Sequence, residues 1–519
     1  MCRSPLDSWE SSVDLIANIG LGFSVALAPI NLLFCFLGVL VGTLVGVLPG
    51  LGPVGAVAFL LSLTFKMEPA SAIILLAGIY YGAMYGGSTT SILVNIPGET
   101  ASVVTCLDGY RMARQGRAGA ALGMAAFGSF IAGTFGVVGL MCLAPLLGRA
   151  ALSFGPPEFF ALTLTGLTLV AYLSQASMLK ALTMATLGLL AGTAGMDPIS
   201  GQERFTYGTL TLRDGFGLVP VAMGLFGIAE VLENLTRIGP QSLYQTKIGS
   251  LLPNAKDWKD SIWPIGRGSL LGFFLGILPG PGPVIASFMS YAMEKRLSRY
   301  PEKFGTGVIE GVAGPEAANN SATAGSFIPL LSLGIPTSGI MALFMGALMI
   351  HGIQPGPLFI SRHPDLFWGF IASMYVGNAM LLVLNLPLIG IWVRVLKTPY
   401  VILFPLILLF CLIGVYSLNA NSVEIVVMLG FGIFGFFMRR AGFEGAPFIL
   451  ALVLGPIMET SLRQSLLISR GNFSIFLNRP ICVVLIALTA AFLIWPILRP
   501  KKKRGELSSE IAKDTKTRS

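Results

Sequence analysis

Charged side chains are scarce along this chain of 519 residues. They make up 11% of the sequence, whereas a soluble globular protein carries roughly 25%. Hydrophobic residues reach 54%, and the mean hydropathy is +0.78. Repeated apolar runs match the ~20 residues that cross a bilayer. The composition excludes an ordinary soluble domain and predicts an all-α polytopic membrane protein with about 10–12 transmembrane helices.

Cysteine and histidine are also rare, with six and two residues. No two cysteines stand at CxxC spacing, and most lie in apolar runs, so the sequence supports neither a metal site nor a disulfide framework. The chain also lacks a phosphate-binding loop with its lysine and a nucleophile–base pair. We therefore expect no enzyme, no ATPase, no cofactor and no metal.

The basic residues are scattered between apolar runs rather than gathered in a patch, although the net charge is +9. Scattered Lys and Arg are typical of cytoplasmic loops, so we expect no nucleic-acid partner. The segments placed in the cytoplasm are 108–117, the linker 236–262 and the basic tail 501–519. Arg463, Arg470 and Arg479 do not fit the alternation that this placement requires.

The apolar runs between these loops predict the individual spans. A first span at 30–48 precedes a short piece at 54–65, which is typical of a re-entrant segment, and a longer run at 70–96. Further spans are expected at 118–148, 157–175, 178–196, 216–235, 340–355, 366–390, 399–418, 422–438, 443–460 and 480–498.

The linker separates two similar halves, 1–235 and 263–500. GVLVGTLVGVLPGLGPVGA from Gly38 matches GSLLGFFLGILPGPGPVIA from Gly268 at a constant offset of 230 residues (268 − 38). Further on, NIPG from Asn95 corresponds to GIPT from Gly334. Repeated halves with interrupted helices in matching positions are typical of secondary transporters. The expected interruptions lie at 48–53, 95–99, 278–283 and 310–339.

Each interruption is expected to expose a helix N-terminus. The free N–H groups there carry partial positive charge and suit an anionic group, above all a carboxylate. Glycines would let the backbone approach such a ligand closely, at Gly50, Gly52, Gly280 and Gly282. The alternative is that these glycines only allow tight helix packing, as small residues do in membranes.

The stretch from Gly307 to Gly339 combines Gly and Pro with polar side chains inside an apolar chain. Glu316 is expected to bind a cation, to carry a proton or to cap a helix. The polar side chains that follow Glu316 along the chain carry oxygens that suit a hard cation such as Na⁺. A Ser or Thr in an apolar helix can instead bond to its own backbone. We expect Glu99 to cap a helix and Glu310 to mark the membrane boundary.

Several motifs resemble the large membrane subunit of the tripartite tricarboxylate transporters, the TctA family. They are LPGLGP (48–53), YYGAMYGGSTTSILVNIPGE (80–99), LPGPGP (278–283), SYAMEKRLSRYPEKFGTGVIEGVAGPEAANN (290–320) and IPLLSLGIPTS (328–338). The resemblance extends over residues ~20 to ~460 of the chain. The family usually has AAPEAANN and GIPGS, where this chain has AGPEAANN and GIPTS, and these departures leave the substrate open.

The resemblance implies a multi-pass permease of the bacterial inner membrane that imports organic di- or tricarboxylates with Na⁺ or H⁺. It implies two partners, a small four-span membrane subunit and a periplasmic solute-binding protein. The expected substrate residues are Gly50, Gly52, Asn95, Pro97, Gly98, Gly280, Gly282, Asn319, Asn320, Pro336, Thr337 and Ser338. The expected cation-coupling residues are Glu316, Asn320, Ser321 and Thr323.

Two other functions are compatible with an apolar chain. A passive anion channel would give flux without saturation or ion coupling, but duplicated interruptions favour alternating access. A membrane-embedded enzyme that uses Glu310 or Glu316 would need a convergent His, Asp or Ser within the apolar runs, and the sequence offers none. We therefore predict a binding-protein-dependent secondary transporter that works by symport.

Overall fold

The structure, a computed structural model, describes residues 15–48, 52–174, 177–197, 199–236, 248–395 and 400–498. Most of these residues lie in helices, and the strands among them, β1 (Gly195–Met196) and β2 (Glu203–Arg204), form one short antiparallel pair. Seven described helices are long and apolar enough to cross a membrane, and shorter apolar helices accompany them. The predicted all-α polytopic membrane architecture is therefore confirmed.

The first half contains α2 to α11. Within it, η1, η2 and η4 are 3₁₀-helices, whereas η3 and η5 are π-helices. The bounds are α2 Leu15–Ala26, α3 Pro29–Val47, α4 Pro53–Leu61, η1 Ser62–Lys66, α5 Pro69–Val94, η2 Thr100–Val103, α6 Thr105–Met112, η3 Ala113–Arg117, α7 Ala118–Ala151, α8 Pro156–Leu173, α9 Met178–Gly192, η4 Leu210–Asp214, α10 Leu218–Ala222, η5 Met223–Ile228 and α11 Ala229–Thr236.

The second half contains α12 to α23, with η6 and η7 as short 3₁₀-helices. The bounds are α12 Ala255–Ile277, α13 Gly282–Leu297, η6 Pro301–Lys303, α14 Glu310–Gly325, α15 Phe327–Leu333, α16 Gly339–Ile350, α17 Phe359–Arg362, α18 Pro364–Asn385, α19 Ile389–Val395, α20 Tyr400–Asn419, α21 Ser422–Arg440, α22 Ala446–Ile468, η7 Phe473–Phe476 and α23 Pro480–Leu498.

Three glycines pack α3 directly onto α5. A Cβ added at any of them would overlap a carbonyl oxygen of α5, because the two backbones touch. The pairs are Gly38 with Leu75, Gly42 with Ile79, and Gly46 with Ala83. The structure thus assigns these repeated glycines to close helix packing.

The second half repeats this contact between α12 and α14. The pairs are Gly268 with Gly314, Gly272 with Ala318, and Gly276 with Ala322. The glycines are displaced by 230 residues from those of the first half (268 − 38), and all three partners are displaced by 239 (314 − 75). The sequence repeat is therefore also a repeat of the packing register, whereas the domain boundaries stay predictions.

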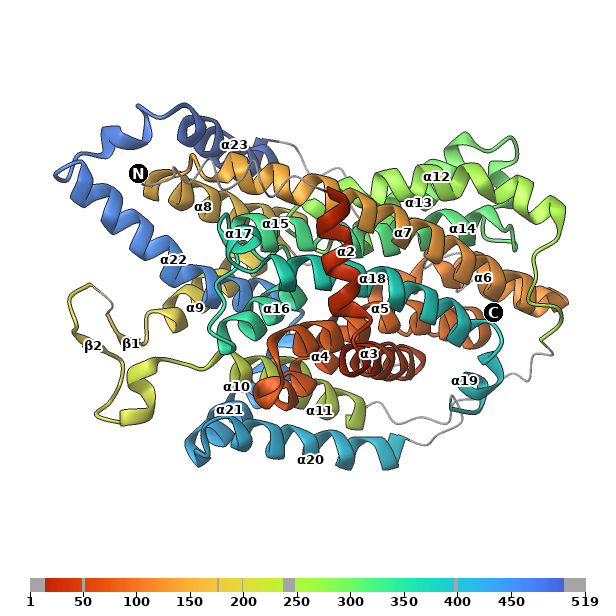
Figure 1. The fold of residues 1–519 in the computed structure, drawn as a ribbon, viewed down its shortest axis with the longest axis horizontal. Coiled ribbons are helices and arrows are strands. Elements are labelled where there is room, and N and C mark those ends of the chain that lie inside the picture. The colour runs from red at the N-terminus through yellow and green to blue at the C-terminus, as the bar shows by residue number, and fades with distance from the viewer. Residues whose placement is uncertain are drawn as a thin grey trace.

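The longest helix, α7, connects the two ends of the molecule. Figure 1 shows α12, α13 and α14 at one end of the long axis, with α9, α22 and the two strands at the other. Helix α7 packs against α14 and α12, and also against α5, α15 and α18. The described end of the linker also lies on α7. There the backbone of Gly123 packs directly against the carbonyl oxygen of Leu251.

Two of the three arginines that do not fit the predicted alternation of cytoplasmic segments form ion pairs with carboxylates. Arg463 forms ion pairs with Asp197 at 2.8 Å and Glu459 at 3.1 Å. Arg479 pairs with Glu158 at 3.0 Å. The Ser200 hydroxyl and the Arg463 guanidinium hold the pKa of Asp197 well below its usual range. These arginines are thus compensated locally, so they carry little topological information.

Candidate functional site

The two interruptions of each half lie side by side. In the second half, the N–H of Gly280 donates to the carbonyl oxygen of Thr337 at 2.8 Å. In the first half, Gly98 packs so closely on Gly46 that a Cβ would overlap its carbonyl oxygen. Helix α4 also contacts α16, and α13 contacts η2, so the helices that follow the interruptions join one half to the other.

Glu316 lies inside α14 and is 1% exposed. Its carboxylate accepts hydrogen bonds from the hydroxyls of Ser88, at 2.6 Å, and Thr105. Both donors belong to the first half, whereas α14 belongs to the second. The alternative that Glu316 caps a helix is wrong, because α14 begins at Glu310 and continues through Pro315. The expected interruption in this stretch lies later, after α15.

Glu99 is a second buried carboxylate, 6% exposed. It caps η2, as expected, by accepting the N–H of Ala101 at 2.5 Å. Its other oxygen accepts the side-chain amide of Asn319 at 3.3 Å. Among the described residues, no Lys, Arg or His forms an ion pair with Glu99 or Glu316. Buried carboxylates without a countercharge are costly, so this pair favours uptake of a proton or a cation.

The asparagine pair after Glu316 faces the first half. The amide of Asn320 donates to the hydroxyl of Ser129 on α7 at 2.7 Å and to the carbonyl oxygen of Glu316 at 3.0 Å. Asn319 reaches Glu99, as described above. Both asparagines are therefore part of the contact between the halves.

Ser321 and Thr323 do not join Glu316. The Thr323 hydroxyl donates to the carbonyl oxygen of Asn319 at 2.9 Å, which is the local backbone bond expected for an isolated threonine. Ser321 is buried, and its hydroxyl has no hydrogen-bond partner within the described part of the chain. Of the expected cation-coupling residues, the structure brings together Glu316 and Asn320.

Left-handed residues end the helix before each second interruption. Asn95, with φ 59°, follows α5, and Gly334, with φ 70°, follows α15. Pro97 and Pro336 stand shortly after them, where proline prevents the helix from continuing. Asn95 is exposed, so it does not belong to the polar cluster around Glu316.

The remaining expected substrate residues mostly bind the protein itself. Ser338 caps α16 by accepting a backbone N–H, and the Thr337 hydroxyl donates to a backbone carbonyl oxygen. The N–H of Gly282 donates to the carbonyl oxygen of Gly280 at 2.8 Å. Gly50 lies outside the described residues. Substrate binding at these positions stays a prediction.

A carboxylate of the protein already occupies the N-terminus of α4. The N–H of Gly52 donates to Glu230 on α11 at 3.0 Å. Arg439 on α21 lies 3.7 Å from Glu230 and 3.4 Å from Glu233. The sequence predicts a substrate carboxylate at this N–H, so Glu230 stands where a ligand group would bind.

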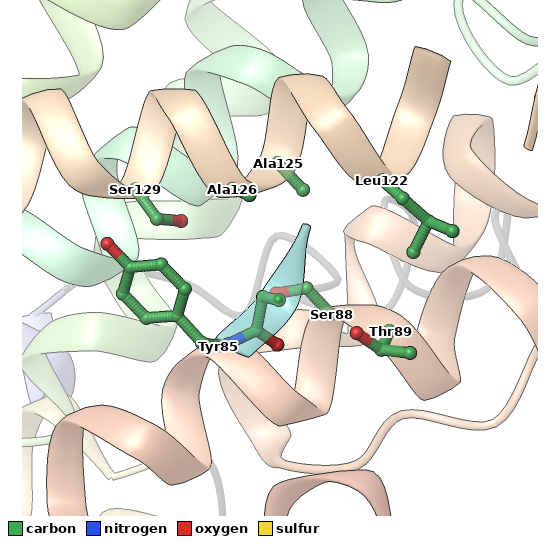
Figure 2. A pocket seen from close by; sticks show the side chains of 8 residues that line it. Tyr85, Ser88, Thr89, Leu122, Ala125, Ala126 and Ser129 are labelled. Atoms are coloured by element: carbon green, nitrogen blue, oxygen red, sulfur yellow. The ribbon is translucent and has the colours of Figure 1, made fainter. Parts of the chain in front are cut away.

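A small cavity lies beside the Glu316 cluster. Figure 2 shows it between α5, which carries Ser88, and α7, which carries Ser129. Its lining residues are Tyr85, Ser88, Thr89, Leu122, Ala125, Ala126, Ser129 and Asn385. Sequence reasoning misses its polar members, because a single Ser or Asn in an apolar helix has no distinctive spacing.

Comparison with known proteins decides the family. The model of the tripartite tricarboxylate transporter TctA family matches residues 32–450, which include all four interruptions. The chain belongs to the TctA family. In this TctA protein the matched region therefore contains the Glu316 cluster, the cavity and both glycine contacts.

Two relatives of this TctA protein come from Agrobacterium vitis. One, described as an uncharacterized 52.8 kDa protein in the TAR-I ttuC' 3' region, is 50% identical over 495 residues, which are 95% of this chain and 99% of the relative. Another, an uncharacterized protein in the TAR-II ttuC' 3' region, is 51% identical over 240 residues, 46% of this chain and 99% of the relative. No solved structure matches.

The carboxylate of Asp108 binds the backbone within the longest motif of this TctA protein, residues 290–320. This carboxylate is fully buried and accepts the N–H groups of Gly305 at 2.9 Å, Gly307 at 2.7 Å and Val308 at 3.0 Å. The hydroxyl of Tyr291 donates to it at 2.9 Å. The sequence places Asp108 only in a basic loop, because its partners lie almost two hundred positions away.

Proposed function

We propose that this TctA-family protein is the large permease subunit of a bacterial inner-membrane importer of organic di- or tricarboxylates. It works with a small four-span membrane subunit and a periplasmic solute-binding protein, and uptake is driven by Na⁺ or H⁺. The tripartite family supports partner subunits. The observation that carries the proposal is the pair of buried carboxylates, Glu316 and Glu99, at the contact between the halves.

The geometry supports coupling through the contact of α14 with the first half. Glu316 on α14 accepts hydroxyl groups of α5 and α6. A cation or proton that joins this cluster removes uncompensated negative charge there, so it favours the conformations in which the two halves are closed around it. Transport follows when carboxylate binding and cation binding favour the same conformation.

Glu316→Gln should abolish cation-stimulated uptake. The amide keeps the shape of the side chain but carries no negative charge. We expect uptake to fall by roughly tenfold or more, since a hydrogen-bonded charge contributes about 1.5–3 kcal/mol. The measurement is uptake of a panel of radiolabelled carboxylates by cells that also express both partners, with and without Na⁺ and with and without a pH gradient.

The matched control is Ser373→Ala, which removes a buried hydroxyl that bonds only to its own helix α18. It should transport at the wild-type rate. Wild-type uptake in Glu316→Gln would contradict the proposal. Flux that neither saturates nor depends on an ion would indicate a channel instead.

Glu230→Gln should lower the KM for the carboxylate. A substrate carboxylate that binds the N–H of Gly52 must displace Glu230, and a neutral amide competes less well than a carboxylate. We expect a decrease of about three- to tenfold, measured from the concentration dependence of uptake. Glu233→Gln is the control, because Glu233 shares Arg439 without bonding to Gly52. An equal KM in both variants would exclude α4 as a substrate site.

A further inference from the structure

Asn385 lines the cavity beside Glu316 and carries a buried oxygen that is not hydrogen-bonded within the described residues. It is the last residue of α18, is 4% exposed and lines this cavity. Its Nδ2 donates to the carbonyl oxygen of Leu381 at 2.9 Å, which fixes the amide orientation, because a flipped amide would place two oxygens together. Oδ1 has no hydrogen-bond partner among the described residues. A buried oxygen of this kind calls for a partner that the protein does not supply.

Two hydroxyl oxygens line the same cavity. Ser88 donates its proton to Glu316 at 2.6 Å, so the lone pairs of its oxygen remain available. Ser129 accepts the amide of Asn320 at 2.7 Å and has a second lone pair. Figure 2 shows these two serines on opposite walls. Three of the residues that line the cavity, on α5, α7 and α18, therefore carry side-chain oxygens with free lone pairs.

The cavity suits a cation and not an anion. No Lys, Arg or His lines it, and the amide nitrogen of Asn385 is already bonded to its own helix. The carboxylate of Glu316 is one hydrogen bond away through Ser88. Neutral oxygen ligands close to negative charge match a hard cation such as Na⁺.

We infer that one Na⁺ ion binds in this cavity to Oδ1 of Asn385 and to the hydroxyl oxygens of Ser88 and Ser129. This inference rests on the proposed cation coupling and gives it a location. Glu316 and Asn320 then act through the two serines, as positioning residues that hold the hydroxyl groups. Ser321 and Thr323 take no part.

The site would couple the ion to the contact between the halves. Ser88 belongs to α5 and binds Glu316 of α14, and Ser129 belongs to α7 and binds Asn320 of α14. A bound Na⁺ draws electron density from both hydroxyl oxygens, so it strengthens the hydrogen bond that Ser88 donates to Glu316. The ion therefore stabilises the contact of α14 with α5 and makes the opening of this contact less favourable.

Sodium binding to the purified permease tests this inference without a substrate or partner. The measurement is the thermal unfolding temperature in detergent at increasing NaCl, with choline chloride replacing it at constant ionic strength. In the wild type, Na⁺ should raise this temperature. Asn385→Leu should remove the Na⁺ effect, or weaken the apparent affinity by at least about tenfold, because an oxygen ligand is lost.

Three further variants make the result specific. Asn385→Asp keeps an oxygen and should retain the Na⁺ effect. Ser129→Ala removes a second ligand with little change in volume and should weaken the Na⁺ effect. This variant keeps the inference testable if Asn385→Leu fails to fold. Ser373→Ala, elsewhere on α18, should behave like the wild type.

Two outcomes would overturn the inference. One is a Na⁺ effect of wild-type size in both Asn385→Leu and Ser129→Ala, and the other is no difference between Na⁺ and choline in the wild type, which would leave water as the occupant. The proposed transport function is judged separately. If no carboxylate is taken up while the Na⁺ effect still requires Asn385, the cavity site stands and the proposed substrate class falls.

Discussion

Gly272→Ala should prevent the protein from accumulating in the membrane in folded form. The new Cβ would overlap the carbonyl oxygen of Ala318 and would lie 2.7 Å from its Cα. Both atoms belong to the backbone of α14, so no side-chain rotation relieves the contact and the helices must separate. Overpacking of this kind costs about 1–3 kcal/mol or more. The yield of monodisperse protein extracted in mild detergent should fall by roughly fivefold or more.

Gly266→Ala is the matched control on the same helix. A Cβ at Gly266 meets no atom within 4 Å. This variant should be extracted at least as well as the wild type, because alanine favours a helix over glycine by about 1 kcal/mol. Gly42→Ala should fail like Gly272→Ala, since its Cβ would lie 2.7 Å from the Cα of Ile79. Normal yields for both variants would contradict the direct backbone contact.

Asp108→Ala should release the loop that precedes α14. Without the carboxylate, the N–H groups of Gly305, Gly307 and Val308 lose their acceptor. Each buried donor left unpaired costs ~1–3 kcal/mol, so the loop would leave its position rather than remain unpaired. Lys303 in this segment is exposed, and trypsin cleavage after it should become at least about tenfold faster.

The control for this experiment is Asp214→Ala, which removes an exposed carboxylate at the end of η4. Its cleavage after Lys303 should match the wild type. If Asp108→Ala were cleaved at the wild-type rate, Asp108 would not hold the loop. Uptake should also fall in Asp108→Ala, because the loop leads directly into α14 and Glu316.

Many of the apolar helices were predictable from hydropathy, because a bilayer requires long apolar helices, although seven described helices are long enough to span where about 10–12 were expected. The expected spans 399–418 and 480–498 lie within a residue or so of α20 and α23. The repeat was predictable too, since the same glycines recur with the same spacing. The sequence could not show whether these glycines contact another helix or a ligand, because close packing and ligand approach require the same residue type.

The polar cluster was predictable only in part. Glu316 stands out because a carboxylate in an apolar chain is unusual. Ser88 and Asn385 do not stand out, because their roles depend on contacts with helices distant in the sequence. The alternative that Glu316 caps a helix was wrong, since α14 continues through Pro315, and proline is tolerated inside a membrane helix where packed neighbours compensate for the lost bond.

The glycine contacts restrict which parts of the protein can slide. A shift of α3 along α5 by about half a turn, ~2.7 Å, would move every glycine away from its matching carbonyl. The same holds for α12 on α14, so each pair must travel as a rigid block. Relative motion is then left to the surface between the blocks, where α14 meets α5, and to the helices after the interruptions, where α4 meets α16 and α13 meets η2. The transport stroke would be a displacement of one helix pair against the other, with the four interruptions at the moving surface.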